Sequence, residues 1–459
     1  MTIKEIFCRG HRRKNGSHFS PTQQIAIAFA VIILLGAVLL TLPVASRSGR
    51  SCGFFFALFT ATSATCVTGL TMFDTWTQWS GFGQIVILVM IEVGGLGFMS
   101  AASFVIFLFR RKVGLRQRMV MAQAMSLTDM DGVVRLQRLV LVGSLLIQLC
   151  GALILTLRFW PEFGFGTAVK WGVFHSVTAF CNAGFDIFGV LKEGSSVMLF
   201  YDDPLVLITL ASLIMIGSLG FLVWQEVVQQ HSWKKFSVYT KLVLLSNVAL
   251  LFGGMVLICL LEWNNPDTLG SMSVPNKLLN GFFQSATTRT AGYFSIDQGS
   301  LTDSGKAITV LLMLIGGSSG STAGGLKTVT VVVLLLFLWS RIRSRSCVTV
   351  FKHTIPERQV LDAVTIVSIV VSLALFGAIV ISATSPVDFT DALYESVSAL
   401  ATVGLTAGAT TSLSLPAQIL IIIYMYFGRV GVLTLSLGFL MGNRAEERFR
   451  YANTNLLIG

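Results

Sequence analysis

The chain alternates long apolar runs with short polar or basic segments, and this alternation predicts its architecture. The runs reach about 20 residues, the length at which a helix crosses a hydrocarbon core of about 30 Å. Runs of this length and number are too extensive to be buried in the core of a soluble protein. We therefore expect spanning helices within residues 24–42, 84–109, 139–157, 205–224, 241–261, 329–339, 360–381 and 417–441.

Four short segments between these runs resemble one another. Each carries an aromatic residue ten positions before a glycine, a stretch rich in Ser, Thr and Ala, and a large apolar residue after the glycine. The segments are FTATSATCVTGL (59–70), FHSVTAFCNAGF (174–185), FFQSATTRTAGY (282–293) and YESVSALATVGL (394–405). Their glycines are Gly69, Gly184, Gly292 and Gly404, separated by 115, 108 and 112 residues.

A second glycine follows each of these segments. Gly94, Gly217, Gly316 and Gly428 lie 25, 33, 24 and 24 residues after the first glycines, in the motifs GGLG, GSLG, GGSSG and GRVG. Two landmarks that keep register over four copies predict four tandem units.

The segment that precedes each loop glycine is about 12 to 15 residues long, too short to cross a bilayer. Helix-start signals stand in the third and fourth copies, where Ser273 precedes Pro275 and Ser385 precedes Pro386. Because irregular backbone cannot face lipid, we expect a short helix that enters the membrane and returns inside the protein. The predicted fold class is an all-α polytopic membrane protein of four tandem helix–pore loop–helix repeats, with eight spanning and four re-entrant helices around one pseudo-fourfold pore.

These units divide the chain into six parts. The predicted parts are a cytoplasmic N-terminal segment (1–20), repeat one (21–118), repeat two with a cytoplasmic linker (119–236), repeat three (237–346), repeat four (347–443) and a cytoplasmic C-terminal tail (444–459).

Composition and charge support this interpretation. Hydrophobic residues make up 54% of the chain and charged residues only 12%, against about 25% in soluble domains. The net charge of +11 does not indicate nucleic-acid binding, because the basic residues cluster between apolar runs, as cytoplasmic loops require. The seven cysteines have neither metal-ligand spacing nor an even count, so we expect no zinc site and no disulfide framework.

The four loop glycines indicate an ion-binding passage. A cation that enters such a passage loses its water, and rings of backbone carbonyls can replace that shell. Carbonyls turn toward one axis only in unusual backbone conformations, which glycine adopts at the lowest cost. The candidate K⁺-binding filter residues are Val67, Thr68, Gly69, Asn182, Ala183, Gly184, Thr290, Ala291, Gly292, Thr402, Val403 and Gly404.

The third unit departs from the others. Residues 304–340 would form a helix of about 55 Å, which is longer than the bilayer is thick. Its centre is dense in glycine and serine, which do not sustain a helix, so we expect a broken helix with a flexible loop below the filter. The candidate gate comprises Gly316, Gly317, Ser318, Ser319, Gly320, Ser321, Thr322, Ala323, Gly324, Gly325 and Lys327, together with Arg429.

Arg429 lies inside an apolar run, and a charge at that depth marks a functional site by default. We expect its guanidinium to bond the carbonyls or hydroxyls of the gating loop, with an ion pair to Glu92 as the alternative. Glu92 itself is interpreted either as a packed or paired carboxylate or as an ion ligand.

Other charged residues lie near the loops. Asp74, Asp186, Asp297 and Glu395 either concentrate cations at the outer mouth or are ordinary solvated charges. His175 is expected to be a hydrogen-bonded core residue rather than a ligand.

From about Thr22 to Asn443 the chain resembles the Trk/Ktr/HKT superfamily of K⁺ transporters, most closely the Ktr-type membrane subunit. The resemblance rests on the four loop glycines, the second landmarks, the Gly-Ser stretch of repeat three and Arg429. It implies an intramembrane gating loop, a homodimer, and a cytosolic ring of nucleotide-binding (RCK/KTN-type) regulatory subunits docked on basic segments such as 110–118 and 341–345. In plant-type relatives a serine at the first loop glycine accompanies Na⁺ transport, so Gly69 implies K⁺.

The function predicted is K⁺ uptake across a cell membrane of bacterial type through a gated, carbonyl-lined pore, dependent on Na⁺ and regulated by the cytosolic subunit. The alternatives are a Na⁺-selective or poorly selective cation pore and an ion-coupled carrier. An intramembrane enzyme is disfavoured, because no HExxH motif and no GxSxG motif with a supporting His lies in the membrane. No cofactor is expected; K⁺, and in one alternative Na⁺, is the transported ion, and the lipid bilayer is the remaining partner.

Overall fold

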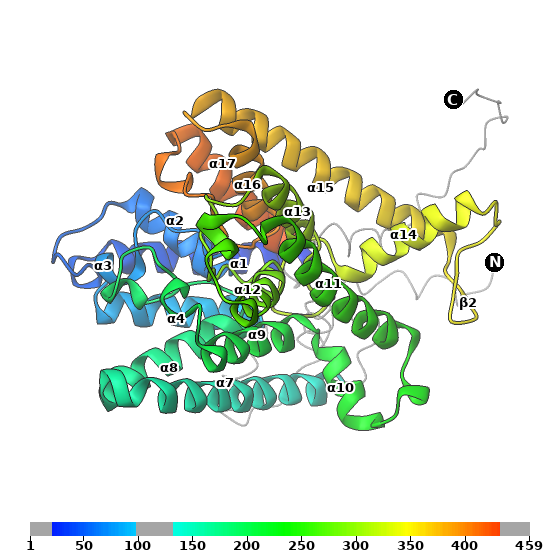
Figure 1. Ribbon diagram of the computed structural model, residues 1–459, viewed down its shortest axis with the longest axis horizontal. Coiled ribbons are helices and arrows are strands. Elements are labelled where there is room, and N and C mark those ends of the chain that lie inside the picture. The colour runs from blue at the N-terminus through cyan, green and yellow to red at the C-terminus, as the bar shows by residue number, and fades with distance from the viewer. Residues whose placement is uncertain (1–20, 98–131, 432–459) are drawn as a thin grey trace, which may run out of the picture.

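The structure is a computed structural model that describes residues 21–97 and 132–431. In these ranges the chain is almost entirely helical, with one short β-hairpin (Figure 1). The helices are α1 (Pro21–Thr41), α2 (Phe54–Thr65), α3 (Thr75–Gln78), α4 (Gly81–Leu96), α7 (Val133–Phe163), α8 (Phe165–Phe180), α9 (Pro204–Ser218), α10 (Phe221–Gln230), α11 (Val238–Glu262), α12 (Val274–Thr287), α13 (Asp303–Leu314), α14 (Thr328–Ile342), α15 (Glu357–Thr384), α16 (Phe389–Leu400) and α17 (Leu415–Tyr426). Strands β1 (Thr349–Val350) and β2 (His353–Thr354) pair antiparallel.

The same order of helices recurs four times. A long helix (α1, α7, α11 or α15) packs most extensively against the short helix that follows it (α2, α8, α12 or α16). Each short helix ends four or five residues before a loop glycine. A further helix then follows, namely α4, α9, α13 or α17.

The four groups of helices also pack on one another in a cyclic order. The third helix of each group contacts the short helix of the next, so that α4 packs on α8, α9 on α12, and α13 on α16. The cycle closes where α17 contacts α2, although these two helices are far apart in the sequence. This packing brings the four loop glycines toward one centre.

The distribution of polarity is that of a membrane protein. The long helices expose large apolar side chains such as Leu149 on α7 and Leu260 on α11. Polar side chains such as Ser176 and Gln284 of the short helices are instead fully buried. Apolar surface of this extent suits lipid and not water. Polar side chains buried at the centre require partners there.

Helix length gives a partial test of the predicted spans. In the described part of the chain, Gln23–Thr41, Val133–Phe163, Val238–Glu262 and Glu357–Thr384 are long and apolar enough to cross a membrane. A fifth span results if α9 and α10 are counted as one bent helix. The full arrangement of eight spanning and four re-entrant helices stays a prediction, as do the six sequence divisions.

Two local expectations need correction. The run at 205–224 is not one straight helix, because α9 and α10 meet at 95°. Gly220, with a φ of 91°, is the N-cap residue of α10 at this bend. In the fourth unit the short helix starts at Phe389 behind Asp388 and not at Pro386. The third unit follows its signal, since Ser273 is the N-cap residue and Pro275 lies in the first turn.

Several sequence predictions fall outside the described residues. They are the cytoplasmic tails at 1–20 and 444–459, the basic segment at 110–118, the ends of repeats one and four, and the start of repeat two.

Candidate functional site

The four loops share an unusual backbone conformation. Two residues before each loop glycine, a non-glycine residue has positive φ: Val67 (57°), Asn182 (60°), Thr290 (64°) and Thr402 (52°). The glycines have positive φ as well: Gly69 (98°), Gly184 (69°), Gly292 (79°) and Gly404 (88°). The residue between them does not. This alternation turns successive carbonyl groups toward the same side, whereas in a strand they point to opposite sides.

The four glycines meet in a closed ring, which we call the glycine ring. A Cβ added to Gly69 would lie 2.5 Å from the carbonyl oxygen of Ala183, and one added to Gly184 would lie 2.7 Å from that of Ala291. A Cβ on Gly292 would similarly lie 2.9 Å from the oxygen of Val403. A Cβ on Gly404 would collide with the oxygen of Thr68, which closes the ring in unit order.

Side chains of the loops and short helices line and support this ring. The hydroxyls of Thr68, Thr290 and Thr402 are buried and have no hydrogen-bond partner among the described residues. Ser63 and Ser398, six residues before their glycines, accept the N–H groups of Gly69 (3.0 Å) and Gly404 (3.1 Å). Unpartnered oxygens next to converging backbone carbonyls are suited to a dehydrated cation.

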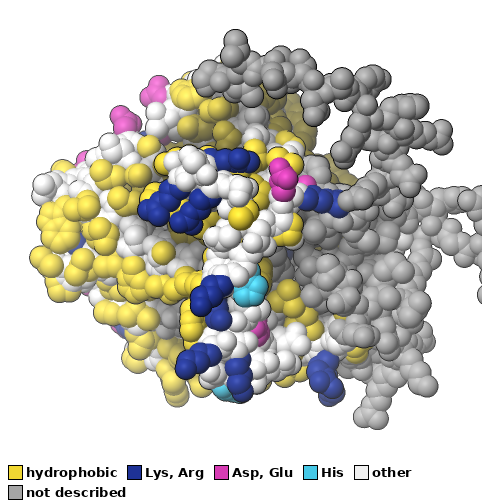
Figure 2. All heavy atoms as spheres, turned by 90° about the vertical axis from the view of Figure 1, so that its right-hand side faces the viewer, with side chains coloured by type: hydrophobic (Ala, Val, Ile, Leu, Met, Phe, Trp, Pro, Cys, Tyr) yellow, Lys and Arg dark blue, Asp and Glu magenta, His cyan; other side chains and the backbone are white. Residues whose placement is uncertain are grey.

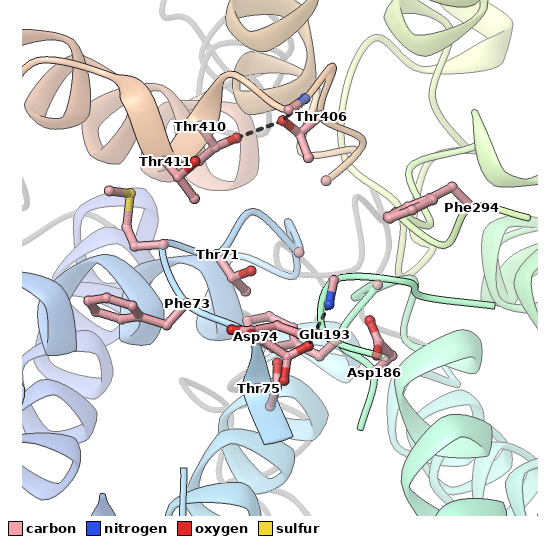
Figure 3. Close-up of a pocket in the computed structure, with 18 residues that line it drawn as sticks. Thr71, Phe73, Asp74, Thr75, Asp186, Glu193, Phe294, Thr406, Thr410 and Thr411 are labelled. Carbon is pink, nitrogen blue, oxygen red and sulfur yellow. Dashed lines mark hydrogen bonds between the residues drawn. The ribbon is translucent and has the colours of Figure 1, made fainter. Parts of the chain in front are cut away.

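A cavity of about 340 Å³ opens above the ring, and all four ring glycines line it. Asp74, Asp186 and Glu193 also line it, while Thr406 and Thr410 border the other side (Figure 3). No Lys or Arg is among the residues that line this cavity. The cavity is therefore a mouth of negative potential that leads to the ring.

Asp74 and Asp186 have different roles in this mouth. Asp74 caps α3 by accepting the N–H groups of Trp76 and Thr77, and its other oxygen accepts the N–H of Gly194 (3.1 Å). Among the described residues, the N–H of Phe188 is the one hydrogen-bond donor to Asp186. Burial, and then the neighbouring charge of Asp74, raise the pKa of Asp186 to about 7. Its charge therefore changes close to neutral pH.

The other two predicted mouth carboxylates lie elsewhere. Glu395 is fully buried in α16 and accepts the hydroxyls of Thr406 and Thr410, so it holds the outer loop of the fourth unit together. Asp297 is exposed and accepts from Gly299 and Ser300, outside the cavity above the ring. Glu193 lines the mouth instead, although sequence reasoning missed it because no repeat pattern marks it.

The loop at residues 316–325 lies against the opposite side of the ring. α13 ends at Leu314 and α14 begins at Thr328, and the intervening residues dock into the bend between α9 and α10. Backbone hydrogen bonds join Ser318 to Ser218, Thr322 to Gly217, and Phe221 to Gly320. The helix is therefore interrupted between α13 and α14, as predicted, and in this structure backbone hydrogen bonds to α9 and α10 hold the loop in place.

Arg429 bridges this loop and the first unit. Its guanidinium donates to the carbonyl oxygen of Thr322 in the loop and to those of Gly94 and Gly95 at the end of α4 (2.5 and 2.9 Å). Lys327 donates to the carbonyl of Ala323 within the loop (3.0 Å). Both cations are satisfied by carbonyl oxygens.

The alternative ion pair between Arg429 and Glu92 is absent from the described residues. Glu92 instead accepts from the side-chain amide of Gln148 (2.9 Å) and the thiol of Cys181 (3.3 Å). A carboxylate with two donors fits the packed interpretation. Its role as an ion ligand stays untested.

Two further buried residues complete the site. His175 has both ring nitrogens bonded, to the carbonyl of Trp171 and the N–H of Ile187, which confirms the core interpretation. Arg289, which sequence reasoning missed, is fully buried one residue before Thr290. The available signal was a charged residue where the other units carry Cys66, Cys181 and Ala401.

Comparisons with known proteins agree on one family. The family model for TrkH, described as a cation transport protein, matches residues 10–448. The potassium/sodium uptake protein NtpJ of Enterococcus hirae is 39% identical over 455 residues, which are 98% of this chain and 99% of that protein. The Ktr system potassium uptake protein B of Bacillus subtilis is 36% identical over 441 residues, 96% of this chain and 97% of that one.

A solved structure shares the fold. The crystal structure of the potassium transporter TrkH from Vibrio parahaemolyticus matches with a TM-score of 0.71 and 17% identity, covering 93% of this chain and 86% of that one. At this identity the likeness concerns the fold alone. Taken with the family match and the two relatives, it shows that this chain is a multi-pass membrane transporter, not an enzyme, and belongs to the TrkH family of cation transport proteins.

Proposed function

We propose that this protein takes up K⁺ across the cell membrane through a gated pore whose selectivity filter is the glycine ring with the two residues before each glycine. The observation that carries the proposal is the closed ring of four glycines at the floor of an acidic cavity. The names of the relatives, a potassium/sodium uptake protein and a Ktr system potassium uptake protein, support K⁺ as the main cargo.

The ring can replace the water that K⁺ loses. The backbone carbonyls of Thr68, Ala183, Ala291 and Val403 each lie against the ring glycine of a neighbouring unit, and they are the proposed oxygen ligands. The buried, unpartnered hydroxyls of Thr68, Thr290 and Thr402 are proposed as further ligands. The short helices α2, α8, α12 and α16 end just before the loops, so the negative ends of their dipoles face the cation. These features make four re-entrant helices around one pseudo-fourfold pore the best account of the architecture.

The 316–325 loop is proposed as the gate. It lies on the side of the glycine ring opposite the acidic mouth, where the hydroxyl of Thr322 donates to the carbonyl of Phe180. Arg429 holds it there and places a fixed positive charge on the ion path. A loop in this position blocks passage, and its release opens the pore.

Orientation follows from the basic residues. Figure 2 shows Lys and Arg gathered on the face that lies to the right in Figure 1, where α10, α14 and β2 lie. Exposed residues there include Lys234, Lys235, Arg341, Arg343 and Arg345. We assign this face to the cytoplasm. The proposal includes a homodimer of this chain and a ring of nucleotide-binding regulatory subunits, which would dock on this cytoplasmic face. It also includes a dependence of K⁺ uptake on Na⁺.

The test is K⁺ uptake in cells that lack their own K⁺ transporters, with and without Na⁺, for the wild type and Gly69→Ser. The wild type is expected to restore growth at low K⁺. The variant is expected to lose the preference for K⁺, because Gly69 has a φ of 98° and no room for a Cβ. A wild type without K⁺ uptake, or a variant with unchanged ion preference, would overturn the proposal. Uptake that favours Na⁺ would support the poorly selective or Na⁺-selective alternative.

A further inference from the structure

The middle of the 316–325 loop is joined to the ring through one side chain, that of Asn182. The hydroxyl of Thr322 lies 3.2 Å from the carbonyl oxygen of Phe180 and 3.3 Å from Oδ1 of Asn182. The Nδ2 group of Asn182 donates to the backbone carbonyl of Arg289 (2.8 Å). A single amide therefore connects the loop, the second unit and the third unit.

The beginning of the loop is joined to the ring by a second link. Nη1 of Arg289 donates to the carbonyl of Ile315, the residue directly before the loop, at 3.3 Å. Arg289 is fully buried, and its Nε and Nη2 have no partner among the described residues. A buried charge with a single bond depends strongly on that bond, because an unpaired buried charge is costly. The loop cannot move away without breaking contacts that ring residues make.

The four units differ in this respect. In units one and four, the N–H of the ring glycine is held by Ser63 or Ser398 of the same unit. The corresponding residue in unit two is Thr178, whose hydroxyl bonds Tyr293 and the carbonyl of His175, and unit three has Ala286 at this place. Units two and three thus lack a serine hydroxyl on the N–H of the ring glycine, and their residues Asn182 and Arg289 bond the loop and the residue before it. The fourth unit bonds the loop from outside the ring, through Arg429.

Asn182 is the ring residue whose hydrogen bonding changes when the loop moves. Its backbone has a φ of 60°, a conformation that asparagine tolerates but that is seldom occupied without support. The side chain is fully buried and bonded at both ends, to Thr322 and to the carbonyl of Arg289. Losing Thr322 leaves a buried amide oxygen without its donor.

We propose that Asn182 is a positioning residue that couples the 316–325 loop to the ion preference of the ring. With the loop docked, Asn182 and Arg289 hold the second and third units in the geometry that favours K⁺. When the loop leaves, these two units relax while the first and fourth stay fixed, so ion preference changes together with gating. This inference rests on the proposed function.

The test uses the purified full chain in liposomes and measures K⁺ and Na⁺ flux separately. Thr322→Val removes the hydroxyl and keeps the volume, whereas Asn182→Gly removes the side chain and keeps the positive φ accessible. Each is expected to lower the ratio of K⁺ to Na⁺ flux by about threefold to tenfold, the range for one lost hydrogen bond. The double variant is expected to do no more than the larger single change, because both remove the same link.

A matched control separates coupling from general damage. Thr365→Val makes the same chemical change on the exposed side of α15, where the hydroxyl donates to the carbonyl of Leu361 in the same helix, and should leave the ratio unchanged. A Thr322→Val protein with raised total flux and an unchanged ratio would overturn the inference, as would effects that multiply in the double variant. A wild type that conducts neither ion would instead remove the proposed function. If Asn182→Gly does not fold, Thr322→Val against Thr365→Val still decides the question.

Discussion

The glycine ring and the 316–325 loop lie against each other and are both rich in glycine, yet glycine serves a different purpose in each. In the ring, one glycine from each unit has positive φ, and each missing Cβ faces the backbone of the next unit. In the loop, a single unit supplies five glycines, of which only Gly320 and Gly325 have positive φ. The ring is a fixed closure between units, whereas the loop is one segment docked by separable hydrogen bonds.

The second landmark glycines show how the loop gains its place. A Cβ on Gly94, Gly217 or Gly428 would collide with the carbonyl oxygen of the last residue of the short helix in the same unit. Gly316 holds the equivalent sequence position, but its Cβ would meet Gly324 of its own loop. In the third unit, the second landmark glycine therefore packs against the loop itself and not against the end of the short helix, and the loop extends to the ring.

The strongest test of the fixed ring is Gly404→Ala. The added Cβ would collide with the carbonyl of Thr68 at a φ of 88°. Backbone strain and overpacking together cost a few kcal/mol, so we expect K⁺ uptake to fall by at least about thirtyfold. Gly408→Ala is the matched control, because it has a φ of 89° and open space around it. Equal losses in both variants, measured as uptake per amount of protein in the membrane, would contradict a special role for the ring.

The next test releases the loop. Arg429→Ala removes three hydrogen bonds to carbonyls of Thr322, Gly94 and Gly95. Because charge-assisted hydrogen bonds contribute about 1.5–3 kcal/mol each, we expect the maximal K⁺ flux to rise by about tenfold or more. Deletion of residues 317–324 should raise it similarly. If neither variant has a higher K⁺ flux than the wild type, the 316–325 loop is not a gate.

A smaller effect is expected at the acidic mouth. With its pKa raised to about 7, Asp186 is mostly neutral at pH 6 and charged at pH 8. The added charge should attract cations, and an interaction of about 0.5–1 kcal/mol in a water-filled mouth predicts a K⁺ concentration for half-maximal uptake about threefold lower at pH 8. Asp186→Asn should abolish this difference. A pH dependence that survives the substitution would place its origin in another group.

The smallest effect is expected for Glu92→Gln. The carboxylate is bonded by Gln148 and Cys181, and an amide of the same size can still accept through its oxygen. We expect K⁺ flux within about twofold of the wild type, since only one interaction is weakened. A loss far beyond this value, or an altered preference between K⁺ and Na⁺, would identify Glu92 as an ion ligand.

Much of the site could be read from the sequence because its signals are local. The four loop segments carry their own pattern, and the four glycines predict positive φ at the positions where the structure has it. Glycine and serine at 316–325 likewise predict a helix break, since neither sustains a helix. Arg289 broke the pattern of its segment, but no sequence pattern could show that its guanidinium meets the backbone carbonyl of Ile315, 26 residues further along the chain.

The sequence by itself therefore predicted apolar helices, four similar loop segments and a break in the third unit, because each of these signals lies within a short stretch of the chain. Only the tertiary structure decided which distant groups meet. Arg429 bonds carbonyls 334 and 335 residues away instead of Glu92, and the loop docks on the bend of α9 and α10. Asp74 and Asp186 reach the mouth with Glu193, while Glu395 does not. Backbone carbonyls are present at every residue, so no sequence pattern can mark the ones that packing brings within reach.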